Sequence, residues 1–341
     1  MRILYGVMCE GMGHAVRSSV VRDHLVSRGH EVTFACGNSR ASKFLSKYGP
    51  VARTPCFSTG TKNGRFNLVE SIKNMPNVAV MNLSPLFLAG LPRPDVVFTD
   101  FEPCVARYAK AWGISLVCLD NIHFMDRCAH PHAVATDRNR AISDILVTRG
   151  VAPDAQRYMV TTFVNAPIRL PRTSLHMPIL RPNTAQACQS DHGSIVVYFN
   201  DLANWPAIVS ALKKLSPVKF RCYGSPTVGV DGNVTLCGVS DQLLEDLACA
   251  KAVIGGAGFT FMTECIYTHK PLLTIPFDHN FEQTLNANYL QALGYGQRCS
   301  SLTSETVGNF LDQVPTFARN LSSVEHDGNA ELFSELDRML G

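Results

Sequence analysis

The sequence predicts an α/β protein of two doubly wound domains, each a parallel sheet flanked by helices. Two observations carry this prediction. Apolar runs of strand length alternate with helical patterns, and the alternation stops at a proline-rich stretch and then starts again. The length of 341 residues also suits two domains better than one. Because parallel sheets bind ligands at the carboxyl ends of their strands, two such domains facing each other are expected to enclose a central cleft.

The predicted organisation is an N-terminal domain over residues 1–170, a connection over 171–193 and a C-terminal domain over 194–341. The connection is predicted from prolines clustered around it, the last being Pro182. The predicted strands are Ile3–Met8, Val32–Ala35, Pro94–Asp100, Ser115–Leu119, Ser194–Phe199, Val218–Tyr223, Val234–Cys237, Ala252–Ile254 and Leu272–Ile275. The predicted helices are Val16–Leu25, Val105–Trp112, Trp205–Leu215, Asp241–Ala250, Phe259–Thr268, Glu282–Leu293 and Ser304–Gln313.

The composition is that of a well-packed globular protein. Hydrophobic residues make up 46% and charged residues 17%, which excludes a disordered chain, and the net charge of +3 is too small for a dedicated nucleic-acid binder. The 12 cysteines form no CxxC pair, which argues against zinc ribbons and thioredoxin-type redox sites. Cysteines inside apolar runs, such as Cys118, Cys222, Cys237 and Cys265, are expected to be buried thiols in a reducing cytosol. No apolar run reaches the ~18 residues that span a bilayer. We therefore expect a cytoplasmic protein, with association at the inner membrane surface left open.

The strongest local pattern is a glycine-rich turn between a strand and a helix, Gly255–Gly258. Glycines let the backbone approach a ligand, and the unpaired amides at the start of the next helix attract phosphate. Glu264 follows about one and a half turns into that helix, where a carboxylate can reach a ribose diol. In the next strand–helix turn, Glu282 and Gln283 offer acceptors and donors to hydroxyl groups. Together these features indicate a sugar nucleotide, and a tight turn without a ligand is the alternative.

The segment from Gly255 to Gly296 resembles the donor-binding region of GT-B glycosyltransferases. These include the UDP-glycosyltransferase superfamily and the bacterial enzyme that adds N-acetylglucosamine to the undecaprenyl-linked peptidoglycan precursor. The opening Gly11-Met12-Gly13-His14 is similar to their acceptor-side loop, and residues 100–103 and 120–123 resemble a bacterial and archaeal branch of glycosyltransferases. The resemblance covers most of the chain. It implies two facing Rossmann-like domains, and transfer of a sugar from a nucleotide-sugar co-substrate to a hydroxyl acceptor without a further cofactor.

The resemblance also implies roles for residues of the C-terminal half. Backbone at Gly256, Ala257 and Gly258, with Thr260, would hold the diphosphate; Glu264 would bind ribose; Glu282 and Gln283 would bind the donor sugar. Relatives commonly carry Asp-Gln at the last pair, so Glu282 is longer by one methylene. Gly256 stands where the plant enzymes have a histidine. By analogy the donor carries UDP or dTDP.

In the N-terminal half, the resemblance makes His14 the base that takes the acceptor's proton, oriented by Asp100 or Glu102 at a later strand end. His123, at another strand end, is the competing base. Gly11, Gly13 and Arg17 accompany His14 on the acceptor side, where Arg17 either meets an anionic acceptor or lies in solvent. The structural alternatives are a His14 held by backbone and an Asp100 that caps a helix.

Two absences shape the expected chemistry. Retaining GT-B enzymes commonly carry two glutamates eight residues apart, whereas leucines, Leu272 and Leu290, stand eight residues after Glu264 and Glu282. We therefore expect inversion at the anomeric carbon. No acid pair lies beside the diphosphate turn, so we expect no metal ion.

The same residues bear on other classes of protein. A dinucleotide oxidoreductase needs GxGxxG at the first turn, which the sequence after Gly11 and Gly13 does not supply. A single-domain, metal-dependent transferase using Asp100 and Glu102 leaves the second half unexplained. A sugar-nucleotide 2-epimerase and a non-catalytic sugar-nucleotide-binding protein stay open. So do the oligomeric state and the acceptor, which could be a small molecule, a lipid-linked sugar, a polysaccharide or a modified nucleobase.

Overall fold

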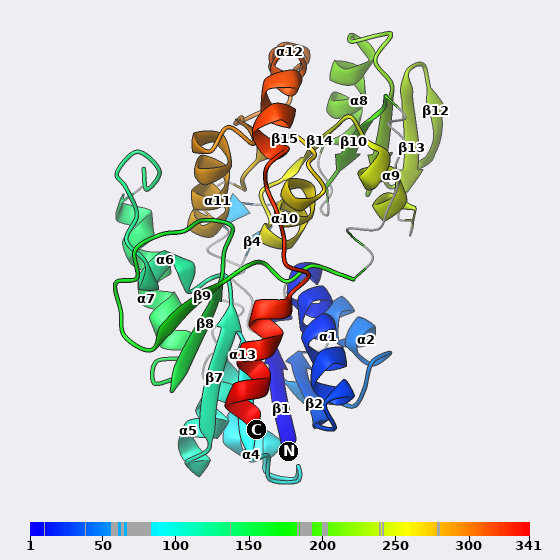
Figure 1. Cartoon of the computed structure of the whole chain (residues 1–341). Helices are drawn as coiled ribbons and strands as arrows, with labels where there is room; N and C mark the ends of the chain where they lie inside the picture. Colours follow the sequence, from blue (N-terminus) through cyan, green and yellow to red (C-terminus); the bar gives the residue numbers. More distant parts are fainter. Residues whose placement is uncertain are drawn as a thin grey trace. The chain divides into compact units, whose positions relative to one another are not determined.

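The structure is a computed structural model of the chain, and it divides into two compact units (Figure 1). The first unit comprises residues 1–62, 66–181 and 327–341, and the second comprises residues 63–65 and 182–326. The described residues are 1–9, 11–37, 39–55, 61–62, 65–66, 83–136, 138–182, 184, 193–199, 204–238, 240, 242–277 and 280–341. Asp241, Asp278, His279 and most of the predicted connection after residue 182 lie outside them.

The first unit is built on a seven-stranded sheet in the order β3-β2-β1-β6-β7-β8-β9, with all neighbouring strands parallel. Its strands are β1 (Arg2–Val7), β2 (Glu31–Gly37), β3 (Val51–Thr54), β6 (Val96–Asp100), β7 (Ser115–Asp120), β8 (Arg157–Thr161) and β9 (Thr173–His176). A separate pair of two-residue strands consists of β4 (Thr61–Lys62) and β5 (Arg65–Phe66). The strands are apolar along most of their length, as expected for a parallel sheet covered on both faces.

Helices cover both faces of the first sheet. They are α1 (Met12–Ser27), α2 (Arg40–Leu45), α4 (Ser84–Leu88), α5 (Pro103–Trp112), α6 (Phe124–Arg127), α7 (Arg138–Val151) and α13 (Ala330–Leu340). Alternate residues of β1, Ile3, Tyr5 and Val7, pack with α1, α2 and α13 in one hydrophobic core. Gly6 faces the other way, where an added Cβ would lie 2.3 Å from Val105 of α5. The close packing of α5 therefore requires glycine at position 6.

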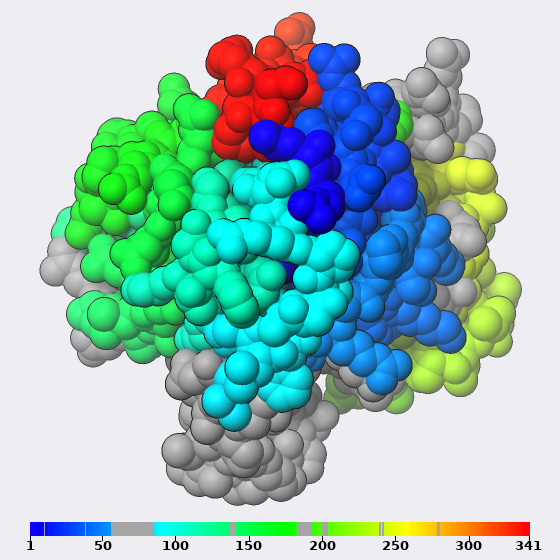
Figure 2. Space-filling view, turned by 90° about the horizontal axis from the view of Figure 1, so that it is seen from below, coloured from blue at the N-terminus to red at the C-terminus, as the bar shows by residue number. Residues whose placement is uncertain are grey.

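The last helix, α13, belongs to the first unit although the whole second unit precedes it in the chain. Leu332, Leu336 and Leu340, spaced by four residues, enter the core beneath β1 and β2. Figure 2 shows α13, in red, against the first residues of the chain, in blue. Asp337 of α13 also lies 2.8 Å from His24 of α1 and forms an ion pair at 3.1 Å with Arg28, which directly follows α1.

The second unit repeats the architecture with a seven-stranded sheet in the order β12-β13-β11-β10-β14-β15-β16. Its strands are β10 (Ile195–Tyr198), β11 (Phe220–Tyr223), β12 (Val228–Asp231), β13 (Val234–Gly238), β14 (Ala252–Gly256), β15 (Leu272–Ile275) and β16 (Gly296–Arg298). All neighbours are parallel except β12 and β13. The helices are α8 (Trp205–Lys213), α9 (Leu243–Cys249), α10 (Phe259–Tyr267), α11 (Phe281–Ala292) and α12 (Ser304–Leu321).

The second sheet is also covered on both faces. Ile254 of β14 packs with α8 and α12 in a second hydrophobic core. Its neighbour Gly255 faces α10, where an added Cβ would lie 2.8 Å from the Phe261 ring and 2.9 Å from the Tyr198 carbonyl oxygen. The glycine thus lets α10 lie directly against β14, which fixes the position of the turn between them.

The predicted fold class, two parallel-sheet α/β halves, is confirmed, and each predicted strand is present to within a few residues. The boundaries differ from the prediction in two places. Strand β9, within the predicted connection, pairs with β8 in the first sheet. Helix α13, within the predicted C-terminal domain, packs on the first sheet because its leucines complete that core.

Two further findings concern expectations from composition. Eight described cysteines are free thiols, including Cys118 and Cys265, but Cys9 and Cys249 are disulfide-bonded. The buried thiols expected in apolar runs are present at Cys118, Cys222 and Cys265, and Cys237 is a free thiol that is partly exposed. The disulfide bonding of Cys9 and of Cys249 was not expected, because sequence spacing does not reveal which sulfur atoms approach each other. Among the described residues, no helix combines the length and the apolarity needed to cross a membrane.

Candidate active site

The first sheet reverses its strand order between β1 and β6, and α/β proteins bind ligands at the carboxyl ends of strands at such a point. His14 lies in the first turn of α1, directly after β1, and Asp100 is the last residue of β6. Gly11 precedes α1 with φ of 77°, a left-handed conformation that favours glycine. The turn therefore brings the start of α1 over the end of the neighbouring strand.

His14, Arg17 and Asp100 form a tight trio at this point. His14 Nδ1 lies 2.8 Å from Asp100 Oδ1, and Arg17 donates from Nε to Oδ2 at 2.7 Å and from Nη2 to Oδ1 at 2.5 Å. Arg17 also donates from Nη1 to Oδ1 of Asn121, just after β7, at 2.5 Å. Asp100 is fully buried and Arg17 is 3% exposed, whereas the His14 side chain is 17% exposed. His14 is thus the member of the trio that solvent reaches.

The charge of Asp100 is stabilised by its neighbours. Burial favours the neutral acid, but the guanidinium of Arg17 and the imidazole of His14 outweigh burial and hold the pKa of Asp100 below its usual value. Asp100 is therefore a carboxylate at neutral pH and accepts the bonds described above. It is not the helix cap that the alternative interpretation suggested, since Glu102 takes that position. Arg17 is buried and bonded, and its guanidinium does not lie in solvent.

Between Asp100 and Glu102 the backbone turns sharply. Phe101 has φ of 56°, a left-handed conformation that costs a non-glycine residue about 1–3 kcal/mol. Hydrogen bonds between Thr99 and Glu102, from the Glu102 amide at 2.8 Å and to its carbonyl at 2.9 Å, hold the turn. As a result Asp100 meets α1, whereas the Glu102 carboxyl caps α5 by accepting from the Val105 amide at 2.8 Å.

Glu102 should make stability depend on pH. Burial raises its pKa to about 7, from 4.5 for an ordinary glutamate, so the folded protein holds a proton that the unfolded chain has released. The contribution of Glu102 to the free energy of unfolding is largest below pH 4.5 and falls as the pH rises from 4.5 to 7. Above pH 7 it is lower by about 3 kcal/mol, since one pKa unit corresponds to ~1.4 kcal/mol. Glu102→Gln should remove this loss, so that its free energy of unfolding in urea exceeds that of the wild type at pH 8 but not at pH 4.5.

The matched control is Asp23→Asn, at an acid that is 55% exposed on α1. Its stability should follow the wild-type pH dependence. Parallel pH curves for Glu102→Gln and the wild type would contradict the buried, protonated Glu102. A cap acts only on α5, so turnover of Glu102→Gln should stay within about twofold; a hundredfold loss would instead place Glu102 among the catalytic groups, as the sequence predicted.

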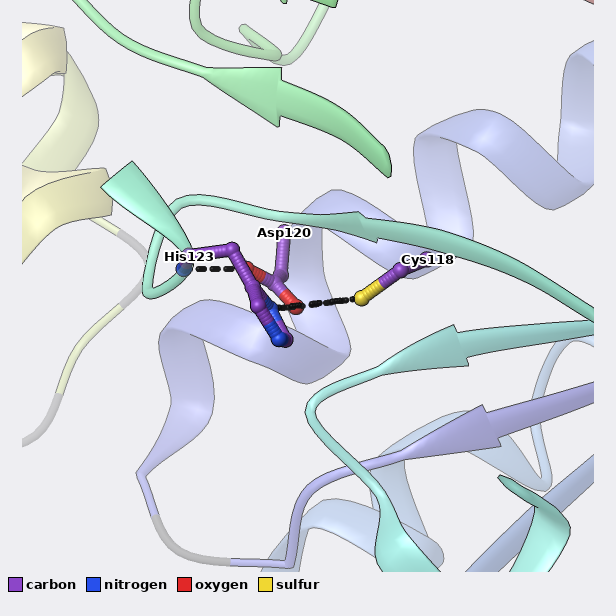
Figure 3. A group of neighbouring side chains, drawn as sticks. All are labelled: Cys118, Asp120 and His123. Atoms are coloured by element: carbon purple, nitrogen blue, oxygen red, sulfur yellow. Dashed lines mark hydrogen bonds and ion pairs between the residues drawn. The ribbon is translucent and has the colours of Figure 1, made fainter. Parts of the chain in front are cut away.

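His123, the predicted competing base, lies in a buried cluster with Cys118 and Asp120 at the end of β7 (Figure 3). Asp120 accepts from the Cys118 thiol at 3.0 Å, from His123 Nδ1 at 2.9 Å and from the His123 amide at 2.9 Å. Burial opposes charge on both members of the ion pair, but their mutual attraction outweighs it, raising the pKa of His123 and lowering that of Asp120. Burial also raises the pKa of the Cys118 thiol. His123 is 1% exposed, so solvent does not reach its imidazole as it reaches that of His14.

In the second unit the strand order reverses between β10 and β14, and α10 starts directly after β14. Gly258 is the N-cap of α10, and no side chain caps the first turn. A Cβ added at Gly256 or Gly258 would meet nothing within 4 Å. Ala257 between them is buried, whereas Thr260 is partly exposed. Space is therefore open beside these two glycines among the described residues, and no described side chain caps the start of α10, which is the arrangement that a phosphate site requires.

Glu264, Glu282 and Gln283 occupy the helices on either side of β15. Glu264 is 3% exposed on α10, so its carboxylate is largely covered in this structure. Glu282 and Gln283 open α11 and are partly exposed. Asn286, one turn later, donates to Glu282 Oε1 at 2.7 Å, and Gln283 Oε1 accepts from the Phe277 amide at 3.0 Å.

Two residues of the sites were missed by the sequence interpretation. Asn121 binds Arg17, and Asn286 binds Glu282 and approaches the Ala257 carbonyl oxygen at 3.5 Å. The available signal for Asn286 was its spacing of four residues from Glu282, which puts the two on one helix face. Asn121 had only its place after a buried strand.

The two mainly parallel sheets, each reversing its strand order once, have the architecture of GT-B glycosyltransferases, and solved glycosyltransferases share this fold. Residues 1–315 match the family described as glycosyl transferase family 1, and the chain belongs to this family. Because the match covers most of the chain, it confirms the resemblance found in the sequence and makes the protein a sugar-transferring enzyme.

Individual relatives agree with the family. An uncharacterised glycosyltransferase of Methanosarcina acetivorans is 24% identical over 90% of this chain and 86% of its own. A UDP-N-acetylglucosamine–N-acetylmuramyl-(pentapeptide) pyrophosphoryl-undecaprenol N-acetylglucosamine transferase of Bacillus cereus is 32% identical over 75 residues, or 21% of each chain. Among solved structures, Phytolacca americana UGT2 complexed with UDP-2-fluoro-glucose and pterostilbene superposes with a TM-score of 0.70. It is 16% identical and covers 99% of this chain and 98% of that one.

Proposed function

We propose that this enzyme transfers a sugar from a UDP- or dTDP-linked donor to a hydroxyl acceptor, with inversion at the anomeric carbon and without a metal ion. His14 is the general base. As the acceptor oxygen attacks the anomeric carbon, its proton passes to His14 Nε2, and the bond between that carbon and the diphosphate oxygen breaks. The nucleoside diphosphate leaves with the charge. The observation that carries the proposal is the pairing of the solvent-accessible His14 with the buried carboxylate of Asp100.

The first unit supports the role of His14 through its hydrogen bonds. Asp100 faces Nδ1, and within the described residues His14 makes no hydrogen bond through Nε2. An imidazole held by a carboxylate on one nitrogen and open on the other suits general-base catalysis. His123 has its own carboxylate partner but is buried, which favours His14 over it.

The second unit supports donor binding through the uncapped start of α10. Its amides, with Thr260, would hold the diphosphate, and the positive end of the helix would stabilise the charge that develops as the diphosphate leaves. Glu282 and Gln283 would bind the sugar, and Glu264 the ribose. The structure of the plant relative with UDP-2-fluoro-glucose motivates the choice of donor.

The test combines binding with turnover. Thermal shift against UDP, dTDP and their glucose and N-acetylglucosamine conjugates should identify the donor, since a ligand at 100 times its Kd stabilises by about 2.7 kcal/mol. With that donor and a panel of phenolic, glycan and lipid-linked acceptors, nucleoside diphosphate release should continue in EDTA. The product should show the inverted anomeric configuration by its ¹H coupling constant. Activity lost in EDTA and restored by Mg²⁺ or Mn²⁺, or a retained configuration, would overturn the mechanism.

A further inference from the structure

His14 contacts Arg17 as well as Asp100, and this contact bears on which nitrogen of His14 carries a proton. His14 Nδ1 lies 2.8 Å from Asp100 Oδ1 and also 2.8 Å from Arg17 Nη2. A guanidinium only donates hydrogen bonds and a carboxylate only accepts them. The proton on Nδ1 therefore decides which of the two contacts is a hydrogen bond, and with it whether Nε2 is bare or protonated.

The acceptor positions of Asp100 favour one of these arrangements. Its Oδ2 accepts from Arg17 Nε at 2.7 Å and from the Ser18 hydroxyl at 3.3 Å, and its Oδ1 accepts from Arg17 Nη2. Each carboxylate oxygen has two lone pairs, so one position on Oδ1 remains. A proton on His14 Nδ1 fills it and leaves Nε2 bare. Because the other three positions are taken from within α1, the carboxylate cannot rotate away from His14.

The described titratable groups that act on Arg17 and Asp100 include Tyr5 of β1 and Cys118 and Asp120 of β7. Burial raises the pKa of Tyr5, so it is neutral, and Asp120 is paired with His123. Arg17 therefore remains the cation that pairs with Asp100.

We propose that Arg17 is a positioning residue for the general base, which locks Asp100 against His14 Nδ1 and leaves Nε2 bare. The inference rests on the proposed role of His14. Because Arg17 is three residues after His14 on α1, the base and the residue that controls it are carried by one helix and move together.

The test is ¹⁵N nuclear magnetic resonance of protein labelled at histidine, with the His14 signal assigned by its loss in His14→Gln. The ring nitrogen shifts report which nitrogen carries the proton. In the wild type, Nδ1 should be protonated and Nε2 bare. In Arg17→Met, where the Asp100 carboxylate is free to turn, the share of His14 with the proton on Nε2 should rise to a measurable fraction. Arg17→Lys keeps the charge but not the two parallel bonds to Asp100, so its share should lie between those of the wild type and Arg17→Met.

Arg22→Met is the matched control, since Arg22 lies on the same helix and pairs with Asp23 at the surface. Its His14 should carry the proton on Nδ1, as in the wild type. If Arg17→Met does not fold because Asp100 is left unpaired, Arg17→Lys supplies the comparison. A wild-type His14 with the proton on Nε2, or a wild-type proton position in every folded Arg17 variant, would overturn the proposal.

Kinetics separate this inference from the proposed function. In Arg17→Met kcat should fall, because less of His14 has a bare Nε2, while the KM for the donor stays within about twofold. The resonance experiment needs neither donor nor acceptor. Expected ¹⁵N shifts with no transfer by any folded variant would therefore defeat the proposed function and leave the control of His14 by Arg17 standing.

Discussion

Replacing His14 with alanine is expected to lower kcat by about 10²–10⁴-fold, which is the usual contribution of a general base. The loss should fall on turnover alone, because His14 belongs to the first unit and the predicted donor residues belong to the second. Donor affinity, measured by calorimetry, should change by less than about twofold. Asp100→Asn should cause a smaller loss, since the imidazole remains but is held less well.

His24→Ala is the control for this experiment. His24 lies on the same helix and pairs with Asp337 of α13 at 2.8 Å, away from the Asp100 trio. Its kcat should match that of the wild type, although some stability is lost with the ion pair. Near-normal turnover by His14→Ala would remove His14 as the base and turn attention to Asp100 or His123.

The second large effect is expected at Glu264. A carboxylate that accepts two ribose hydroxyls makes charge-assisted hydrogen bonds, each contributing roughly 1.5–3 kcal/mol. Glu264→Ala should therefore weaken nucleoside diphosphate binding by at least about tenfold in calorimetry. Glu264→Gln retains the shape and one acceptor oxygen, and its loss should be intermediate.

The burial of Glu264 makes this a sharp test. At 3% exposure the side chain must become accessible to a ribose, or it serves only the packing of α10. Unchanged affinity in both variants, together with a lowered free energy of unfolding, would assign Glu264 to the fold and remove it from the donor site. Normal stability with weakened binding is the outcome that supports ribose recognition.

An element of the fold could be predicted where the pattern that defines it lies within a short stretch of the sequence. Strands such as β1 and β14 are apolar runs that end in glycine-rich turns, and both were predicted because those signals lie within ten residues. Strand β9 was expected only as a short strand of the connection and not as part of the first sheet, because it is short and has only one buried residue, His176. The leucine spacing of α13 indicates a helix, but which sheet it covers depends on contacts with the beginning of the chain.

The site residues could likewise be predicted only where their positions follow from local sequence patterns. The positions of His14 and Asp100 followed from parallel strands, whose carboxyl ends meet at one edge, and the structure brings these two side chains together as expected. The buried state of Arg17 could not be predicted, because a charged residue on a helix ordinarily faces solvent. Only the carboxylate supplied by a distant strand explains why its guanidinium is directed inward. The roles of these residues in catalysis stay predictions.

The place of α13 has a consequence for the order in which the protein is made. Translation supplies the strands of the first sheet early, but the leucines that close its core emerge only after all of the second unit. Domains generally fold as units during synthesis, with the N-terminal one first. Until α13 has been made, the surface of the N-terminal sheet that Leu332, Leu336 and Leu340 cover stays exposed. The second unit is thus the first whose residues have all been synthesised.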